Sequence, residues 1–254
     1  MKQRIITGLI LAVILFPALY VGGWPLRAVV IFFLTISTYE IIHATGKKFP
    51  IWLLVLLLTS VFVLGTIQLE YLLPLIISLF IGLFIITILT KVFQTDDLAY
   101  LFMMTLIIAL TLRSVVAIQS YGTRMVVYIA FITYATDSAA YFAGSFFGKH
   151  KLIPRISPMK TVEGAIGGWI GGFLIGLGFG FLFIRSISFE LILVSSLLLP
   201  IIGQFGDLAF SALKRHYEIK DFGSIFPAHG GVLDRIDSLI FNLLFFYVLL
   251  IFFL

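Results

Sequence analysis

Long, uninterrupted apolar runs recur along the chain, and their pattern predicts the fold class. The run LLVLLLTSVFVLG at 53–65 lacks the alternation of polar and apolar positions that a strand of a membrane β-barrel would show. Apolar stretches of about 18 or more residues can cross the ~30 Å hydrocarbon core as helices. Because backbone polar groups in lipid must bond one another, helices are the remaining solution. The pattern therefore predicts an all-α fold, a polytopic integral membrane helical bundle.

About nine spans fit the hydropathy, and turn-forming residues separate them. The first span follows Met1-Lys2-Gln3-Arg4 and resembles a signal peptide, but it lacks a convincing small-residue cleavage site after Pro17 and further spans follow it. We therefore expect it to be retained as a helix. The predicted spans are 5–23, 26–45, 51–68, 72–91, 98–118, 125–147, 164–184, 188–210 and 238–254.

Composition supports a lipid environment. Of the 254 residues, 61% are hydrophobic and 11% are charged, whereas soluble domains carry about 25% charged residues. The mean hydropathy is +1.17. The chain has no cysteine, which excludes disulfides, thiolate nucleophiles and thiolate metal sites.

The loops on the two sides differ in positive charge. With the N-terminus placed in the cytoplasm, thirteen of the 17 Lys and Arg residues fall on the cytoplasmic side and four on the other. This bias favours a cytoplasmic N-terminus and an external C-terminus. The net charge of +5 also suits anionic headgroups and phosphates. We expect a multi-pass protein of the plasma membrane whose polar segments face the cytoplasm.

The two halves of the chain differ in content. Residues 1–130 are mostly apolar and are predicted to be scaffold, whereas residues 131–254 carry the candidate chemistry. In the seventh span a glycine recurs every four residues, which places these glycines on one stripe of a helix. A stripe of this kind lets a second helix approach closely. We favour packing over ligand contact for Gly164, Gly168, Gly172, Gly176 and Gly180.

A polar segment at 207–238 combines acids, bases and glycines. If the eighth helix continues through Arg215, then Asp207 and Ser211 share one face with the pair Lys214 and Arg215. A hard cation on the carboxylate, with basic side chains above it, would bind a polyphosphate. Mg²⁺ fits, because it prefers a few carboxylates, retained waters and substrate phosphates. Zinc is disfavoured by the absence of cysteine and by only four histidines.

The loop that follows can also face an anion. The Gly230-Gly231 pair permits positive φ angles and lets backbone N–H groups approach an anion. Asp234 and Asp237 then open the last helix, where each can cap the helix or bind metal. His229 has no obvious serine partner, so a nucleophilic triad is poorly supported.

Two further carboxylates lie within predicted spans. Asp137 is about ten residues inside the sixth span and has small neighbours. A carboxylate at membrane depth is costly and is functional by default, and the alternative is a helix–helix hydrogen bond. Glu40 lies near the inner end of the second span, and for it a functional role and a helix–helix hydrogen bond are equally supported.

These residues resemble the phosphatidate cytidylyltransferase (CDP-diacylglycerol synthase) signature over 28 consecutive positions. The matching elements are Ser211-Ala-Leu-Lys214-Arg215, Lys220-Asp221-Phe-Gly223, Pro227-Ala-His229-Gly230-Gly231 and Asp234-Arg235-Ile-Asp237-Ser238. The stretch from Ser157 to Gly164 and the surroundings of Asp137 are also similar to that family. The first half matches only in hydropathy and length.

The resemblance implies transfer of a cytidylyl group from CTP to phosphatidic acid, with CDP-diacylglycerol and pyrophosphate as products. It implies a requirement for Mg²⁺, held by Asp207 and Asp234, and a second cation such as K⁺. CTP, phosphatidic acid and membrane lipids are the expected partners, with no nucleic acid and with a homodimer as a candidate assembly. The catalytic residues it implies are Asp207, Asp234, Lys214, Arg215, Lys220, Asp221, His229 and Asp237. The substrate-binding residues are Ser157, Lys160, Thr161, Glu163, Ser211, Gly230, Gly231, Arg235 and Asp137.

Two alternatives remain. One is a related cytidylyltransferase or CTP-dependent kinase that acts on a polyprenyl or other lipid phosphate. The other is a transporter or channel, in which polar interruptions usually occur near the midplane of corresponding helices in repeated halves. Here the polar residues cluster at one face and in one half of the chain, which argues against transport.

Overall fold

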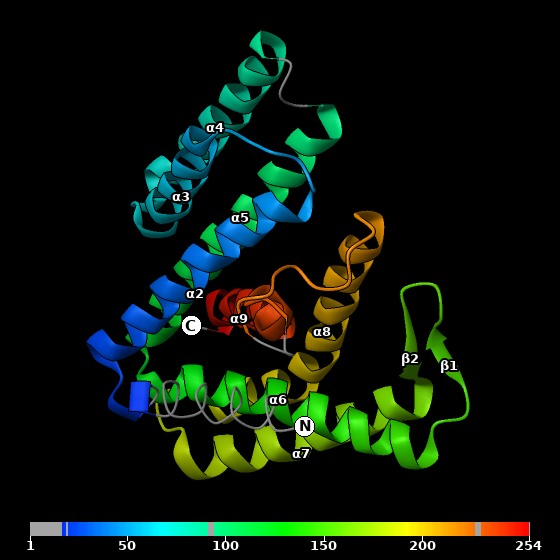
Figure 1. The fold of residues 1–254 in the computed structure, drawn as a ribbon. Coiled ribbons are helices and arrows are strands. Elements are labelled where there is room, and N and C mark those ends of the chain that lie inside the picture. Colours follow the sequence, from blue (N-terminus) through cyan, green and yellow to red (C-terminus); the bar gives the residue numbers. More distant parts are fainter. Residues whose placement is uncertain (1–16, 19, 91–93, 227–229, 254) are drawn as a thin grey trace.

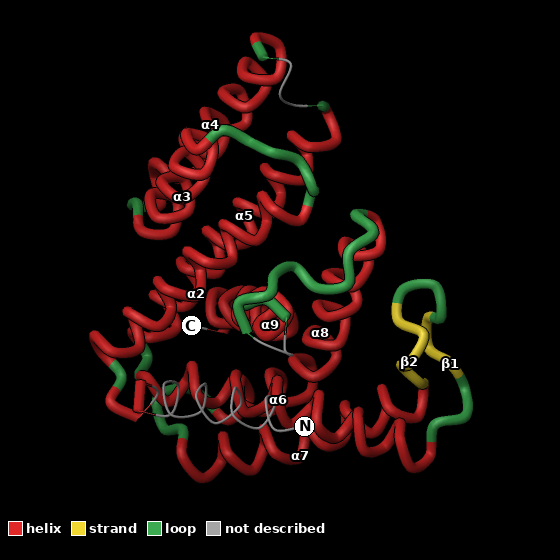
Figure 2. The backbone as a smooth tube through the Cα atoms, viewed as in Figure 1, coloured by secondary structure: helices red, strands yellow, loops and turns green. Residues whose placement is uncertain are grey.

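Most residues are helical in the computed structural model, which describes residues 17–18, 20–90, 94–226 and 230–253 (Figures 1 and 2). Seven of the described helices are long and apolar enough to cross a membrane. The predicted helical membrane bundle is therefore confirmed. The elements are α2 (Gly23–Ala44), α3 (Ile51–Thr66), α4 (Leu69–Leu89), α5 (Thr95–Ser120), α6 (Thr123–Phe147), β1 (Lys151–Ile153), β2 (Ser157–Thr161), α7 (Val162–Phe183), α8 (Phe189–His216) and α9 (Leu233–Phe253).

The predicted span count is approximate for two reasons. Most of the first span, 5–23, lies outside the described residues. The third, 51–68, forms α3, which has only 16 residues. At 1.5 Å per residue a helix of that size is about 24 Å long, so it is shorter than the ~30 Å hydrocarbon core.

The last helix is the central element of the bundle. Helix α9 contacts α5 on one side and α6 and α8 on the other, and Figure 1 shows it end-on among these helices. Helices α3 and α4 lie farther out, beside α5. The beginning of α9 is thus surrounded by elements from both halves of the chain.

Helices α6 and α7 pack against each other along their length, with the glycine stripe between them. All five stripe glycines are buried. A Cβ atom at Gly168 would meet Ala140, and one at Gly172 would meet Thr136 of α6 and Pro200 of α8. The expectation that these glycines serve packing agrees with this geometry.

A β-hairpin between α6 and α7 is an element that the hydropathy did not predict. Strands β1 and β2 pair antiparallel, with Lys151 opposite Thr161 and Ile153 opposite Ser157. Pro154 and Pro158 are turn-forming residues, and a proline is unusual within a strand. Pro154 is tolerated because it lies in the turn that connects the two strands. Pro158 lies in β2, and each strand of a two-stranded sheet is an edge strand, where a residue without an N–H group can be accommodated. The hairpin projects beside α8 (Figure 1).

Candidate active site

Helix α8 continues to His216, as the sequence argument required. The Ser211 hydroxyl donates to Asp207 Oδ1 across one turn, at 3.2 Å. Lys214 and Arg215 follow in the last turn of the same helix, where positive charge suits the negative end of the helix dipole. The predicted polar face of α8 is therefore present.

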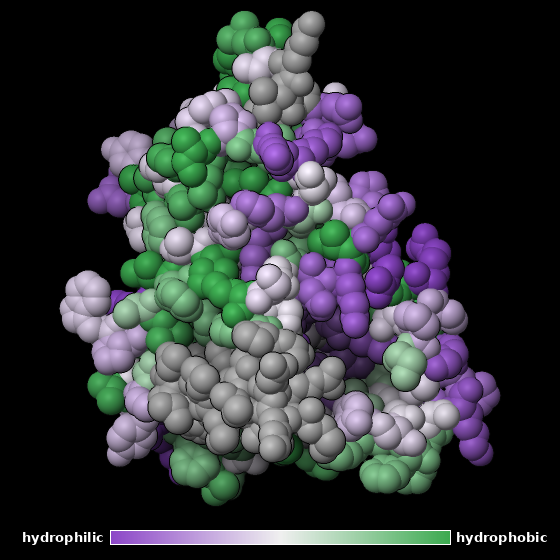
Figure 3. All heavy atoms as spheres, viewed as in Figure 1, coloured by the Kyte–Doolittle hydropathy of each residue, from purple (hydrophilic) through white to green (hydrophobic). Residues whose placement is uncertain are grey.

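A polar pocket of about 420 Å³ lies where α6, the hairpin, α7 and α8 meet. We call it the polar pocket. Its wall contains four of the predicted site residues: Asp137 from α6, Lys160 and Thr161 from β2, and Asp207 from α8. The Asp137 side chain is exposed and lines this pocket. On the surface, hydrophilic side chains gather on the side of the hairpin and the end of α8 (Figure 3).

An ion pair between Lys160 and Asp207 joins the hairpin to α8. Each side chain keeps 28% of its surface exposed, so a substrate can compete for either partner. Asp137 and Asp237 both lie close enough to Asp207 for the like charges to interact. The pocket wall thus holds carboxylates of α6 and α8 beside a lysine, and Asp237 of α9 is buried behind it.

Asp234 anchors the loop that precedes α9. Its Oδ1 accepts from Lys214 Nζ at 2.8 Å, and its Oδ2 accepts from the backbone N–H groups of Phe222 (2.8 Å) and Gly231 (2.9 Å). Gly230 has a φ of 82°, and a Cβ atom there would approach Asp221 and Asp234. The Gly230-Gly231 backbone therefore faces carboxylates of the protein itself.

The remaining predicted residues divide into structural and exposed groups. Arg215 Nε donates to the carbonyl of Ile156 at 3.3 Å, which ties the hairpin tip to α8. Thr161 caps α7 by accepting from Gly164 N–H at 3.1 Å. Glu163 accepts from His150 Nδ1 at 2.6 Å and from the His150 and Lys149 backbone. Side chains with substantial exposure to solvent include Lys220, Asp221 and Arg235; Ser157 is partly exposed, and His229 lies outside the described residues.

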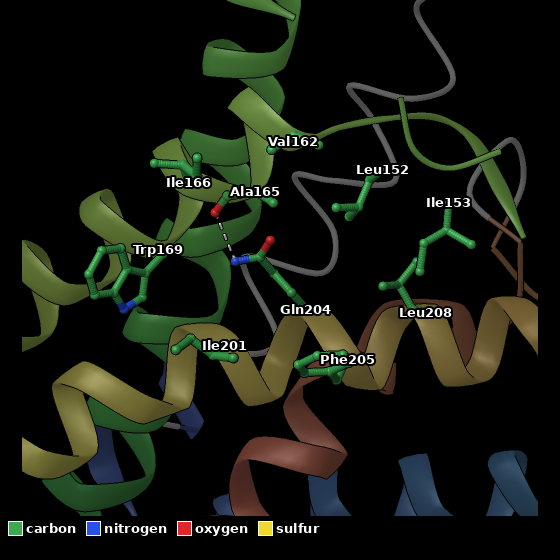
Figure 4. A pocket seen from close by; sticks show the side chains of 10 residues that line it. All are labelled: Leu152, Ile153, Val162, Ala165, Ile166, Trp169, Ile201, Gln204, Phe205 and Leu208. Carbon is green, nitrogen blue, oxygen red and sulfur yellow. Dashed lines mark hydrogen bonds between the residues drawn. The ribbon is translucent and has the colours of Figure 1, made fainter. Parts of the chain in front are cut away.

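An apolar groove of about 520 Å³ adjoins the polar pocket (Figure 4). It runs between α7, α8 and the hairpin, and Leu152, Ala165 and Gln204 line both spaces. Gln204 Nε2 donates to the carbonyls of Ala165 (3.2 Å) and Pro200 (3.1 Å), so its amide bridges the two helices. The other lining residues are Ile153, Val162, Ile166, Trp169, Ile201, Phe205 and Leu208.

Neither this groove nor Gln204 was predicted from the sequence. Each lining side chain is an ordinary residue of an apolar helix, and only the packing of α7 on α8 brings them together. Gln204 was the one available signal, because it is an amide in the middle of an apolar span.

The carboxylates fit a cation that takes few protein ligands. Among the described residues, no three His, Asp or Glu side chains are close enough together to hold an ion by themselves. Mg²⁺ usually needs only one or two carboxylates and takes its other ligands from water and substrate phosphates. A cation beside Asp207 would also relieve its repulsion with Asp137 and Asp237.

Comparison with known proteins covers nearly the whole chain. Residues 2–253 match the model of the cytidylyltransferase family. The phosphatidate cytidylyltransferase of Bacillus subtilis (strain 168) is 34% identical over 262 residues, covering 98% of this chain and 97% of that protein. Those of Staphylococcus haemolyticus and Staphylococcus aureus (strain COL) are 34% and 32% identical, with 99% of each chain covered. The match includes the first half, where hydropathy alone gave no specific signal, and the chain belongs to the cytidylyltransferase family.

Proposed function

We propose that the polar pocket is the site at which this membrane enzyme transfers a cytidylyl group from CTP to phosphatidate. The products are CDP-diacylglycerol and pyrophosphate. The observation that carries the assignment is the Lys160–Asp207 ion pair in a pocket that opens onto an apolar groove. A lipid phosphate needs both environments at once, one for its charged head and one for its chains.

The reaction is an in-line displacement at the α-phosphorus of CTP. An oxygen of the phosphatidate phosphate forms the new bond to phosphorus, while the bond to the bridging oxygen of the β-phosphate breaks and pyrophosphate leaves with that electron pair. A phosphate monoester is already ionised near neutral pH, so no strong general base is required. Catalysis then rests on positioning and on stabilising developing charge.

Lys160 is the residue that we assign to the reacting phosphates. It is partly exposed in the pocket and can exchange the Asp207 carboxylate for a phosphate oxygen. Lys214 is more enclosed, with 12% of its side chain exposed, and it holds Asp234. Its role, and that of Arg215, is to fix the walls around the substrate. Lys220 is exposed and remains a candidate ligand for pyrophosphate.

We propose Mg²⁺ as the cofactor, with Asp207 as its principal protein ligand. The sequence-based prediction pairs Asp207 with Asp234, whereas the described contacts favour Asp137 or Asp237 as the second carboxylate, because Asp234 already accepts three hydrogen bonds. When bound, the ion would neutralise charge on the phosphates. A second cation such as K⁺ stays a prediction.

The apolar groove is the proposed site for an acyl chain of phosphatidate. Its volume of about 520 Å³ falls within the roughly 300–1,000 Å³ of small-molecule sites. Because three residues line both spaces, the chain would enter the groove directly beside the phosphate. A cytoplasmic orientation of the polar pocket agrees with the charge bias. Assembly as a homodimer stays a prediction.

A substrate comparison tests the proposed function. Purified protein with labelled CTP and Mg²⁺ should form a lipid-soluble cytidine product from phosphatidate, and chelation of the metal should abolish it. The KM for phosphatidate should fall as its chains lengthen from eight carbons, because more of the groove is filled. A product formed only from polyprenyl phosphate would replace the proposed substrate, and equal KM values for all chain lengths would remove the groove from the site.

A further inference from the structure

A glutamate of the N-terminal half reaches the beginning of the last helix. Glu40, near the end of α2, is 3% exposed. Its Oε1 accepts from the backbone N–H of Val232 at 2.8 Å, and its Oε2 accepts from that of Leu233 at 2.9 Å. The carboxylate therefore caps α9 although it is 192 residues away along the chain.

Two glycines of the loop leave the space that this carboxylate occupies. A Cβ atom at Gly223 or at Gly231 would run into the Glu40 side chain. Neither glycine has a positive φ angle, so backbone conformation does not account for them. The close approach to Glu40 is the structural reason for a glycine at each position.

Glu40 and Asp234 divide three successive N–H groups between them. Gly231 donates to Asp234, and Val232 and Leu233 donate to Glu40. The first N–H groups of a helix lack partners within that helix, and a negative charge there is favoured by the helix dipole. These N–H groups are therefore occupied by carboxylates of the protein and not by a substrate phosphate.

We propose that Glu40 is a positioning residue for cytidylyl transfer. It fixes the beginning of α9, which carries Asp234 in its first turn and Asp237 just after that turn. Asp234 holds Lys214 at the end of α8. The backbone carbonyl of Asp237 packs against Gly206, the residue before Asp207. Through these contacts α2 sets the geometry of a pocket whose wall it does not line. The inference rests on the proposed function, because α9 affects turnover only if the polar pocket is the reaction site.

The test compares Glu40→Gln with a matched substitution, Glu70→Gln, in the exposed first turn of α4. Glutamine keeps the size, but one of its two polar atoms is a donor and cannot accept from an N–H group. For partners that orient carboxylates at metal sites, substitution typically costs about 10–100-fold in activity, and we expect a loss of that size in kcat per folded molecule. Glu70→Gln should match the wild type.

Hydrogen exchange supplies a readout that does not depend on activity. In Glu40→Gln, amide exchange should accelerate in the segment 230–237 and stay unchanged in α3 and α4. If Glu40→Gln does not fold, Gly223→Ala carries the test, because it displaces the same carboxylate. If both fold, the double variant should be no worse than the more impaired of the two single variants, since both changes act through one contact.

Unchanged kcat and unchanged exchange in Glu40→Gln would overturn the proposal. Acceleration spread evenly over the bundle would also overturn it, since Glu40 would then be a general packing contact. Failure of the proposed function looks different: Asp207→Asn would keep full turnover, while the local exchange effect of Glu40→Gln would remain.

Discussion

Two lysine–aspartate pairs near the pocket differ in how far water reaches them. Lys160 and Asp207 each keep 28% of the side chain exposed, whereas Lys214 and Asp234 keep 12% and 4%. An ion pair that water reaches is weak and exchanges partners readily. This suits Lys160, which must release the Asp207 carboxylate before it binds a substrate phosphate. An enclosed pair is difficult to break, because separation leaves a buried charge without a partner. The first pair is suited to binding and the second to structure.

Asp234→Asn should therefore lower stability as well as activity. It leaves the Lys214 charge enclosed without its counter-ion, and removal of one partner from a buried pair costs roughly 3–5 kcal/mol. Thermal unfolding of the protein in detergent should show a clearly lower Tm. Adding Lys214→Met should recover much of that Tm, because the unmatched charge is gone, without restoring turnover. An unchanged Tm in Asp234→Asn would show that the pair does not anchor the loop.

At the scale of elements, the contact between α6 and α7 determines the shape of the pocket. The two helices approach closely because glycines of α7 face small residues of α6, and the polar pocket lies at the end of this contact. Any side chain added to the stripe would push α7 away from α6.

Gly172→Ala and Gly178→Ala form a matched pair that tests this contact. A Cβ atom at Gly172 would meet Thr136 and Pro200, whereas at Gly178 it would meet nothing within 4 Å. Overpacking typically costs about 1–3 kcal/mol, so Gly172→Ala should lower the Tm. Gly178→Ala should be neutral or stabilising, since alanine favours a helix over glycine by roughly 0.5–1 kcal/mol. Equal Tm values for the two variants would contradict the packing role.

The sequence predicted helices well and short polar elements poorly. The predicted span ended at 210, and the shared face of Asp207, Ser211 and Lys214 was conditional on the helix continuing through Arg215. Helix α8 meets this condition, because it continues to His216. The hairpin at 151–161 has strands of three and five residues with two prolines nearby, and so gives no periodic signal. Its position next to α8 depends on Lys160 and Arg215 contacts that no local pattern encodes.

At the scale of the whole molecule, the two halves share one functional region. Helix α9 packs on α5 as well as on α6 and α8, and Glu40 of α2 caps its beginning. The division into a scaffold at 1–130 and a catalytic half at 131–254 stays a prediction, although this cap argues that the first half does more than support. Sequence pattern could mark Glu40 as unusual but could not find its partner, because the contact joins residues 192 positions apart.

Membrane orientation provides a prediction for the entire chain. The distribution of thirteen Lys and Arg residues against four favours a cytoplasmic N-terminus, and an odd number of spans puts the C-terminus outside. Reporter fusions at the two ends should therefore give opposite sidedness. The same sidedness at both ends would rule out nine spans and would require an even number of crossings.

The most direct measurement is the rate of cytidylyl transfer to phosphatidate by Asp207→Asn beside Glu190→Gln. Both changes neutralise a carboxylate on α8, but Asp207 lines the polar pocket and Glu190 lies in the exposed first turn at the other end of the helix. Loss of one group that stabilises developing charge typically costs about 10²–10³ in kcat. We expect a loss of at least that size for Asp207→Asn, at equal amounts of folded protein, and wild-type turnover with normal Mg²⁺ dependence for Glu190→Gln. Near-wild-type turnover and unchanged Mg²⁺ dependence in Asp207→Asn would contradict the assignment of the polar pocket as the active site.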